Sequence, residues 1–340
     1  MKRTVLFYLF VPAFFLILLN SLTFLISCSQ DPIFSMIADE VEPKEPLISG
    51  SPSKFVNSGG VIYVANGRLW MYTNNIWSRV ADTPSNIYDI AAGGGGLYML
   101  RVDGNDTAVY KLGGSKIENP TGYGLIQGLY SGGSDIVAGA KKKDSDEYAI
   151  LGINGDTFSV KQLINSPLTG VADSYFATAI SGIYNGNTLV PGSSGHSIAG
   201  IINANGKIIA VTGPGAILEV SGSGVVVHEK NIYFTGALAL YSNRGTTLLL
   251  LGVRNSVYDL GYREMKFDGN FTLNIPGDTA PDSSVSDRDK YRATLAKCAV
   301  NSLIQAGSTA GGGDGLPVVF ASTQKDGVWA YRDNEWNAEE

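Results

Sequence analysis

Two copies of one nine-residue phrase stand near the two ends of the chain, LWMYTNNIW at 69–77 and VWAYRDNEW at 328–336. They align without a gap and share the pattern Trp-x-Tyr-x-(Asn/Asp)-Asn-x-Trp, and together they hold all 4 tryptophans. The matched aromatic residues are Trp70, Tyr72 and Trp77 in the first copy and Trp329, Tyr331 and Trp336 in the second. Recurrence at matched positions favours packing within a repeated unit, and the alternative is a surface on which a carbohydrate stacks.

Short β-rich runs separated by turns fill the chain from Phe55 onward, for example Val61–Val64, Leu97–Leu100, Ile232–Phe234 and Val318–Phe320. The turns often carry Asn-Gly or Asp-Gly, which tolerate the positive φ of tight hairpins. These dipeptides begin at Asn66, Asp103, Asn154, Asn185, Asn205, Asp268 and Asp326. No helical pattern alternates with the runs, as a parallel α/β fold would require, so the sequence predicts an antiparallel all-β protein.

The β-rich runs also repeat as a larger unit, with weak echoes at Tyr88–Ile90 and at Gln127–Tyr130. A period of roughly 30 to 50 residues holding four short strands is typical of a propeller blade. We therefore predict a β-propeller of about seven four-stranded blades, with six and eight as alternatives. The predicted segments are 55–80, 86–118, 125–164, 175–212, 216–244, 246–280 and 291–338. Because an open array would leave unpaired edges, we expect the first and last repeats to be neighbours.

One stretch, 287–305, fits a blade poorly. Ser286 and Asp289 form a fair helix capping box. Tyr291, Leu295, Cys298 and Ser302 would share one face of a helix. The alternative, a strand in the second half, is favoured because Val300–Ile304 stands where a blade needs an inner or middle strand.

The C-terminal phrase Val319–Thr323, with Lys325–Tyr331 and Trp336 after it, resembles blades of bacterial sensor-type propellers. It is especially similar to propeller-like lipoproteins of spirochaetes. The resemblance is concentrated at the C-terminal end of the chain and is faint in the middle. It implies a surface for extracytoplasmic interactions rather than a particular reaction.

The first 27 residues have the pattern of a secretory signal peptide. Lys2 and Arg3 precede an apolar run, and no charge occurs from Thr4 to Gln30. The run ends in a tetrapeptide that resembles the lipobox of bacterial lipoproteins, made of Leu25, Ile26, Ser27 and Cys28. The resemblance implies cleavage before Cys28, lipid such as palmitate on Cys28, and anchoring to a membrane. The alternative is an uncleaved transmembrane helix.

The residues after Cys28 predict a tether. Four prolines and five acidic residues fall between Ser29 and Ser53, and such a composition keeps a segment extended. The predicted organisation is a signal peptide at 1–27, a lipidated cysteine and flexible tether at 28–54, and a β-propeller domain at 55–340. With Cys28 acylated, Cys298 has no disulfide partner and is expected to be a buried apolar thiol.

Charge excludes one class of partner. The formal net charge is −6, and charged residues make up only 16% of the chain. An acidic surface repels nucleic acid, so a general nucleic-acid binder is excluded.

Motifs for catalysis are missing from the sequence. The 2 histidines cannot build a His-rich metal site, His196 lies among Gly and Ser in a turn, and His228 is expected at a hairpin tip. The Gly runs at 93–96 and 311–313 precede strands, whereas a phosphate loop needs a following helix. We therefore predict no catalytic residue, no metal site and no cofactor.

The function predicted from these observations is a non-enzymatic binding or assembly scaffold, lipid-anchored on the extracytoplasmic side of the cell envelope. The expected partner is an envelope or extracellular protein or glycan, and the chain is expected to be a monomer. The alternative is a propeller hydrolase acting on glycans or peptides, which needs convergent carboxylates. Its candidates are Asp89, Asp135 and Asp259. A sensory domain is disfavoured because no cytoplasmic output region is recognised.

Overall fold

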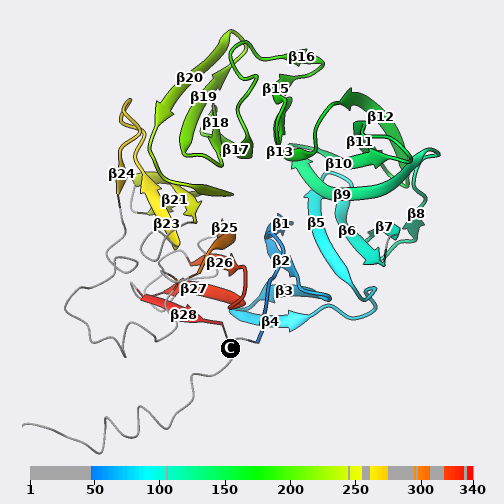
Figure 1. Ribbon diagram of the computed structural model, residues 1–340. Coiled ribbons are helices and arrows are strands. Elements are labelled where there is room, and N and C mark those ends of the chain that lie inside the picture. The colour runs from blue at the N-terminus through cyan, green and yellow to red at the C-terminus, as the bar shows by residue number, and fades with distance from the viewer. Residues whose placement is uncertain are drawn as a thin grey trace, which may run out of the picture. The chain divides into compact units, whose positions relative to one another are not determined.

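A computed structural model describes residues 47–104, 106–243, 246–254, 261–274, 295, 298–306, 318–332 and 335–339. Within these residues the chain forms seven sheets, each of four antiparallel strands in sequence order. The sheets surround a common centre, and β1, β5, β9, β13, β17, β21 and β25 lie nearest to it (Figure 1). The fold is therefore a seven-bladed β-propeller, as the sequence predicted.

The strands of the first four blades are as follows. Blade 1 holds β1 (Val56–Ser58), β2 (Val61–Ala65), β3 (Leu69–Thr73) and β4 (Ile76–Arg79). Blade 2 holds β5 (Ile87–Gly93), β6 (Gly96–Asp103), β7 (Asp106–Lys111) and β8 (Lys116–Ile117). Blade 3 holds β9 (Tyr123–Gly132), β10 (Asp135–Lys142), β11 (Tyr148–Asn154) and β12 (Thr157–Ile164). Blade 4 holds β13 (Leu168–Ala172), β14 (Tyr175–Thr178), β15 (Gly182–Asn185) and β16 (Thr188–Leu189).

The remaining three blades complete the ring. Blade 5 holds β17 (Ile198–Ala204), β18 (Lys207–Thr212), β19 (Ala216–Ser221) and β20 (Gly224–Glu229). Blade 6 holds β21 (Phe234–Asn243), β22 (Thr246–Val253), β23 (Gly261–Met265) and β24 (Leu273–Asn274). Blade 7 holds β25 (Val300–Gln305), β26 (Val319–Thr323), β27 (Val328–Arg332) and β28 (Glu335–Ala338).

The predicted blade boundaries hold at the ends of the chain and are wrong in the middle. Segments 55–80, 86–118 and 125–164 match blades 1 to 3, and 291–338 contains blade 7. Segments 175–212, 216–244 and 246–280 are wrong, because blades 4, 5 and 6 span 168–189, 198–229 and 234–274. The physical reason is that blade 4 is short, with only two residues in β16, so the predicted fourth segment ran into blade 5.

The second half of 287–305 is a strand, which the sequence favoured over a helix. Val300–Gln305 is β25, the innermost strand of blade 7. The proposed capping box at 286–289 lies outside the described residues.

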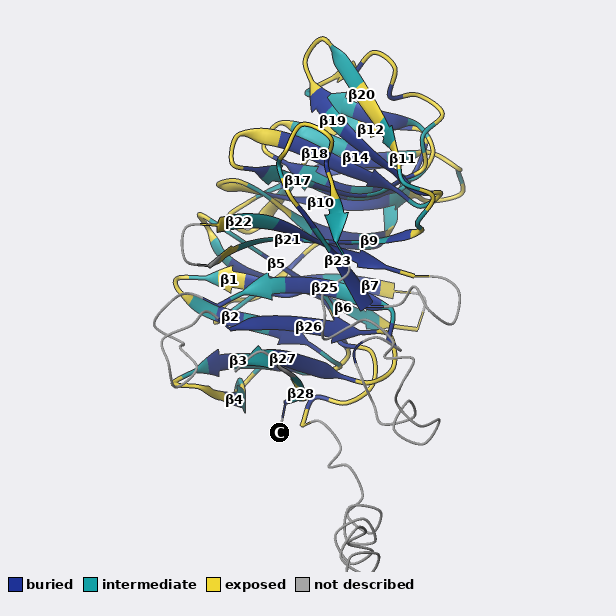
Figure 2. Cartoon of the chain, turned by 90° about the vertical axis from the view of Figure 1, so that its left-hand side faces the viewer, coloured by how far each residue is buried: buried dark blue, intermediate teal, exposed yellow. Residues whose placement is uncertain are grey.

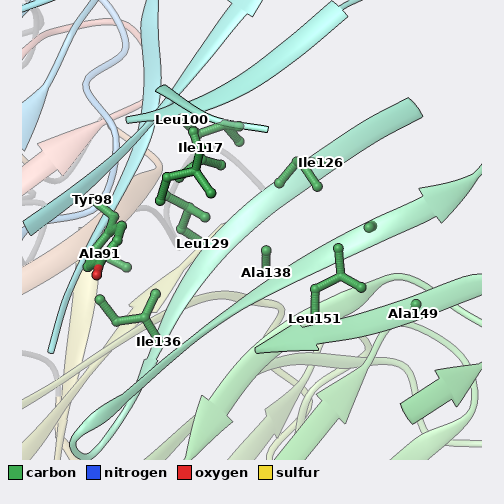
Figure 3. Close-up of a cluster of buried hydrophobic side chains, with 12 residues drawn as sticks. Ala91, Tyr98, Leu100, Ile117, Ile126, Leu129, Ile136, Ala138, Ala149 and Leu151 are labelled. Atoms are coloured by element: carbon green, nitrogen blue, oxygen red, sulfur yellow. The ribbon is translucent and has the colours of Figure 1, made fainter. Parts of the chain in front are cut away.

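The core lies between neighbouring blades rather than within one. One cluster joins blade 2 to blade 3, where Leu100 and Ile117 face Ile126 and Leu129 (Figure 3). Buried residues dominate β26 and β27, whereas exposed residues gather in turns and along part of β20 (Figure 2). Each blade has two apolar faces, so it stays soluble only when both neighbours cover it.

The first and last blades are neighbours, which closes the ring as expected. Trp77 of β4 and Phe320 of β26 belong to one buried cluster, with ring centroids 5.2 Å apart. The segment before β1 runs along blade 7: Leu47 N–H donates to Glu339 O at 2.8 Å, and Val328 N–H donates to Ile48 O at 3.1 Å. Ile48 is 1% exposed. The folded part therefore includes 47–54, which the sequence placed in the tether.

Candidate binding site

The innermost strands of blades 2 to 7 each carry a β-bulge in their first half. In blade 2, Ile87 pairs with Arg101 and Asp89 with Leu100, so Tyr88 is the bulged residue. Gln127 is skipped in the same way in blade 3. The same irregularity occurs at Thr169, Ala199 and Asn301 in blades 4, 5 and 7, and blade 6 has a wider bulge in which Thr235–Ala237 lie opposite Gly252. A β-bulge re-aims a side chain, and such bulges are common beside functional sites.

Blade 1 has an equivalent residue just before β1. Val56 pairs with Tyr63, and Ser53 N–H donates to Ala65 O at 2.7 Å. A regular ladder would place Lys54 opposite Ala65, so Lys54 occupies the bulged position. The innermost layer thus presents a ring of bulged residues, here named the bulge ring.

The up-and-down order of the strands places the bulge ring at one face. Innermost strands begin at this face, which we name the entry face, and the turns between second and third strands lie there too. First-to-second and third-to-fourth turns lie at the opposite, exit face. The bulge ring therefore surrounds the entry-face mouth of the central channel, where β25, β1, β5 and β9 lie side by side (Figure 1).

A hollow of about 840 Å³ opens at this mouth, and we name it the mouth hollow. Four members of the bulge ring line it, and the rest of its lining comes from entry-face turns and links and from residues of β2, β5, β6 and β9. The lining residues are Ser51, Pro52, Ser53, Lys54, Ala65, Asn66, Gly67, Asn86, Ile87, Tyr88, Asp89, Val102, Gln127, Gly128, Tyr130, Asn301, Gln324 and Lys325. Its volume is in the range of small-molecule sites.

An ion pair crosses the mouth hollow. Lys54 Nζ lies 2.8 Å from Asp89 Oδ2, and it also donates to Leu129 O. Asp89 is fixed in turn by its own backbone contacts, since Ile90 N–H donates to Oδ1 and Leu129 N–H to Oδ2, each at 2.9 Å. The Lys54 and Asp89 side chains are 29% and 13% exposed. The pair therefore ties blades 1, 2 and 3 together and leaves no net charge.

Two tyrosines lie beside this pair in different environments. Tyr130 lies beneath Lys54, whose Nζ is 4.5 Å from the ring centroid, and its hydroxyl donates to Leu168 O at 2.7 Å. Burial, with Asp89 adding to it, raises the pKa of Tyr130 far above its ordinary value, so the phenol stays neutral. Tyr88 is 64% exposed and stands at the rim.

Gln127 leaves a polar atom unsatisfied inside the hollow. Its Oε1 is buried and has no hydrogen-bond partner among the described residues. An unsatisfied buried acceptor costs about 1–3 kcal/mol, so such an atom needs an explanation. A ligand that donates a hydrogen bond would satisfy it once the side chain turns this oxygen toward the hollow.

The carboxylates named for a hydrolase do not converge. Asp89 lies at the entry-face mouth, whereas Asp135 begins β10 and therefore lies at the exit face. Asp135 pairs with Lys161 at 2.8 Å, and the hydrogen bond from Lys161 lowers the pKa of that carboxyl. Asp259 lies outside the described residues. Among the described residues there is also no group of three His, Cys, Asp or Glu that could hold a metal ion.

The repeated aromatic residues lie between blades, not in the mouth hollow. Trp77 and Tyr72 of blade 1 pack on Phe320 of blade 7. Trp336 packs on Tyr262 of blade 6, with centroids 5.6 Å apart. The remaining members are Tyr331, 5.5 Å from Trp336, the buried Trp329, and Trp70, packed against the cluster between blades 1 and 7. Each copy of the phrase therefore contacts the preceding blade.

The histidines lie away from the hollow. His196 lies in a turn, as expected. His228 is not at a hairpin tip: it lies within β20, pairs with Ile217 and packs edge-on against Phe271 at 4.5 Å. The apolar run of β20 continues through it, which the local sequence did not indicate.

The lipidation site falls outside the described part of the chain. Cys28, Leu25, Ile26 and Ser27 belong to residues 1–46. Cys298 is buried, as expected, and its Sγ lies 3.0 Å from Asp326 Oδ2. In the portion that the structure describes, no helix is both long enough and apolar enough to cross a bilayer.

Sequence comparison finds one partial relative. An uncharacterized lipoprotein of Treponema pallidum (strain Nichols) is 33% identical over 102 residues, which cover 27% of this chain and 21% of that protein. The match thus spans about a fifth of the relative's length. No protein-family model matches the chain.

Several solved propellers share the fold. The WD40 propeller domain of Doa1 has a TM-score of 0.52 and 10% identity over 88% of this chain and 95% of that one. The computationally designed Ika8 protein has a TM-score of 0.52 and 9% identity over 87% of this chain and 91% of that one. PorZ, a bacterial surface component of the type-IX secretion system of Porphyromonas gingivalis, has a TM-score of 0.52 and 11% identity, covering 87% of this chain and 39% of that chain. The chain is thus a seven-bladed β-propeller with a distant, partial similarity to a Treponema lipoprotein.

Proposed function

We propose that this protein is a lipid-anchored module of the bacterial cell envelope that binds an extracytoplasmic partner and catalyses no reaction. The signal peptide, the lipobox ending in Cys28 and the partial similarity to a lipoprotein support the anchor. The propeller acts as a rigid monomeric scaffold that presents one binding face. The resemblance of the last blade to sensor-type propellers agrees with a surface built for interactions.

The mouth hollow is the observation that carries the binding role. It is about 840 Å³, it opens at the face where the second-to-third-strand turns and the links between blades meet, and bulges place Tyr88, Gln127 and Asn301 in its lining. Loops on a rigid scaffold are the usual place for binding residues. The Oε1 of Gln127 is buried and unpaired, so a turn of this side chain toward a bound partner would gain a hydrogen bond.

Charge in the hollow supports binding over hydrolysis. Glycoside hydrolysis commonly needs two carboxyl groups on either side of the scissile bond. Of the lining residues, Asp89 is the one carboxylate, and Lys54 and two backbone N–H groups already occupy its oxygens. This arrangement leaves no second acid to pair with it inside the hollow.

The test is binding of the purified full chain, in detergent, to envelope fractions from the producing bacterium with its own gene deleted. We expect sedimentation with the envelope, and its loss in a Tyr88→Ala/Gln127→Ala variant. Val226→Ser, at an exposed residue of β20, is the control and should bind as the unmodified chain does. Unchanged binding of the mouth variant, or release of cleaved envelope material that requires Asp89, would overturn the proposal.

A further inference from the structure

We propose that the ligand of the mouth hollow is a saccharide that bears a carboxylate. This inference rests on the proposed binding function and names its chemical class of ligand. It follows from three properties of the lining: its carboxamides, its exposed tyrosine and its single uncompensated cation.

The lining is rich in groups that both donate and accept hydrogen bonds. Five carboxamides contribute to it, namely Asn66, Asn86, Gln127, Asn301 and Gln324, together with two serines, Ser51 and Ser53. A sugar hydroxyl is also donor and acceptor at once, so neighbouring hydroxyls of one ring match the two ends of a carboxamide. Gln127 Oε1 is buried and unpaired in this conformation, so the side chain gains a hydrogen bond if it turns this oxygen toward such a hydroxyl.

Other carboxamides keep acceptor groups available. Asn301 donates through Nδ2 to Thr323 O at 3.1 Å and to Ser51 Oγ at 3.3 Å. These bonds fix the plane of the amide and leave Oδ1 without a partner in the described structure. The group is thus oriented before a ligand arrives, which reduces the entropy that binding costs.

Tyr88 provides an apolar face beside these polar groups. Its side chain is 64% exposed at the rim although it lies in an innermost strand, because the bulge turns it out of the ladder. A sugar ring has a face of C–H groups that an aromatic ring can cover, while the tyrosine hydroxyl keeps its own polar contacts.

The apolar lining does not suit a peptide. Ala65 and Ile87 are 1% and 2% exposed, so they form walls behind the hollow and not a floor that a side chain could fill. Protein partners usually anchor a large apolar side chain in a desolvated pocket. The exposed surface of the hollow is instead mostly polar.

The charge of the lining indicates that the saccharide bears a carboxylate. Lys54 and Asp89 neutralise each other, whereas Lys325 is exposed on the β26–β27 turn and has no ion-pair partner among the described residues. The hollow therefore has one net positive charge in a chain whose formal net charge is −6. A carboxylate placed at Lys325 would gain a charge-assisted hydrogen bond.

The experiment uses two oligosaccharides of equal length as probes. A hyaluronan hexasaccharide alternates an acidic and a neutral sugar, and hexa-N-acetylchitohexaose, called chitohexaose below, has the neutral N-acetylated sugar alone. Titration calorimetry with the full chain in detergent should show tighter binding of the hyaluronan probe, weakening as salt rises. Lys325→Gln should weaken that binding about tenfold and leave the chitohexaose titration unchanged. Tyr88→Ala should weaken both.

Matched controls and contrary outcomes keep the test decisive. Tyr233→Ala changes an exposed tyrosine outside the hollow, and Lys142→Gln an exposed lysine of blade 3, so neither should alter binding. If neither probe binds while Tyr88→Ala/Gln127→Ala still abolishes envelope binding, the saccharide assignment fails and the mouth-binding function stands. If protease treatment of the envelope removes its binding capacity, the partner is a protein and the assignment also fails. If both probes bind equally and Lys325→Gln changes neither affinity, the proposal that the saccharide bears a carboxylate is wrong.

Discussion

Trp77 Nε1 donates a 2.9 Å hydrogen bond to Oε2 of Glu339, which joins the last strand of blade 1 to the residue that follows the last strand of blade 7. Arg332 binds the same carboxylate through both terminal nitrogens, at 2.6 and 2.9 Å, and also donates to the Tyr72 hydroxyl. Among the described residues each blade consists of consecutive strands, so no described strand is exchanged between the ends of the chain. Side chains and the segment 47–50 therefore hold the ring closed.

Truncation of Trp77 tests this closure. Trp77 is 3% exposed and packs edge-on against Phe320, so Trp77→Ala should lower the free energy of unfolding by about 3–5 kcal/mol. Ile76→Ala, at the adjacent residue, which is 65% exposed, should change it by less than about 0.5 kcal/mol. Urea unfolding followed by tryptophan fluorescence and by circular dichroism gives both values. Equal effects of the two substitutions would show that the junction contributes nothing special to stability.

Ionisation of Glu339 predicts a pH dependence. Burial raises the pKa of this carboxyl above its ordinary value of 4.5, against the lowering effect of Arg332. A raised folded pKa means that the stabilising contribution is present below the unfolded pKa and is lost as pH rises through the folded pKa. The unmodified chain should therefore lose stability relative to Glu339→Gln as pH rises from about 4 to 7.

Thermal unfolding midpoints across this pH range provide the measurement. Glu118→Gln, at a carboxylate whose side chain is 80% exposed, is the matched control. If the unmodified chain instead gains stability over Glu339→Gln with rising pH, attraction to Arg332 outweighs burial and the assigned direction is wrong.

The sequence predicted the architecture because its signals are local. The matched copies at 69–77 and 328–336 occupy β3–β4 and β27–β28, the outer pairs of blades 1 and 7. Aromatic residues that pack on the preceding blade must recur wherever that contact recurs. The bounds of blade 4 were predicted wrongly because its outermost strand has two residues and no copy of the aromatic phrase occurs in it.

The mouth hollow was missed because no local pattern marks its chemistry. A signal for the bulges is present in the chain as apolar-x-Gly triplets, IQG at 126–128, LTG at 168–170, IAG at 198–200 and FTG at 234–236. These four triplets lie in the innermost strands of blades 3 to 6, but the same pattern occurs elsewhere, for example VAG at 137–139 in β10, so it does not mark a bulge by itself. Lys54, however, falls in the segment taken for a tether, and its partner Asp89 is 35 residues away. Only the closed ring brings them together.

Close contact between blades 5 and 6 predicts a strict requirement for glycine. A Cβ on Gly200 would lie 2.3 Å from the carbonyl oxygen of Gly236. The atoms that it would meet all belong to the backbone of Gly236, which cannot move aside as a side chain can. Gly200→Ala should therefore force the two blades apart and cost about 1–3 kcal/mol of stability. Gly222→Ala, where no atom lies within 4 Å of the added carbon, is the control. Chemical unfolding of both variants decides the matter, and a neutral Gly200→Ala would show that the blades can separate freely.

Lipidation predicts a defined mature N-terminus. Mass spectrometry of the chain from its native envelope should find acylated Cys28 as the first residue, since Leu25, Ile26, Ser27 and Cys28 resemble a lipobox. Cys28→Ala should leave an unlipidated precursor that no longer incorporates a labelled fatty acid. Cys298→Ala is the control for the other thiol and should leave labelling unchanged. An intact leader or cleavage elsewhere would contradict the lipoprotein assignment.

The final prediction compares two ion pairs of equal length and different burial. Lys54–Asp89 in the mouth and Lys161–Asp135 at the exit face both span 2.8 Å, but the carboxylates are 13% and 63% exposed. Removing the cation from the mouth leaves a buried carboxylate with only its backbone donors. Lys54→Met should cost about 1.5–3 kcal/mol, the range for hydrogen bonds to charged groups. Lys161→Met should cost less than about 1 kcal/mol, because solvent screens the exposed pair.

A double-mutant cycle separates the pair from other effects of the substitution. Lys54→Met/Asp89→Asn removes both charges, so it should cost less than the sum of the two single substitutions. The coupling energy, obtained from four urea unfolding curves, should exceed about 0.5 kcal/mol. The same cycle at Lys161 and Asp135 should show smaller coupling, because water replaces either partner there. Additive effects at Lys54 and Asp89 would mean that the mouth is held open by strand pairing alone, and that the ion pair crossing it is free to exchange for a ligand.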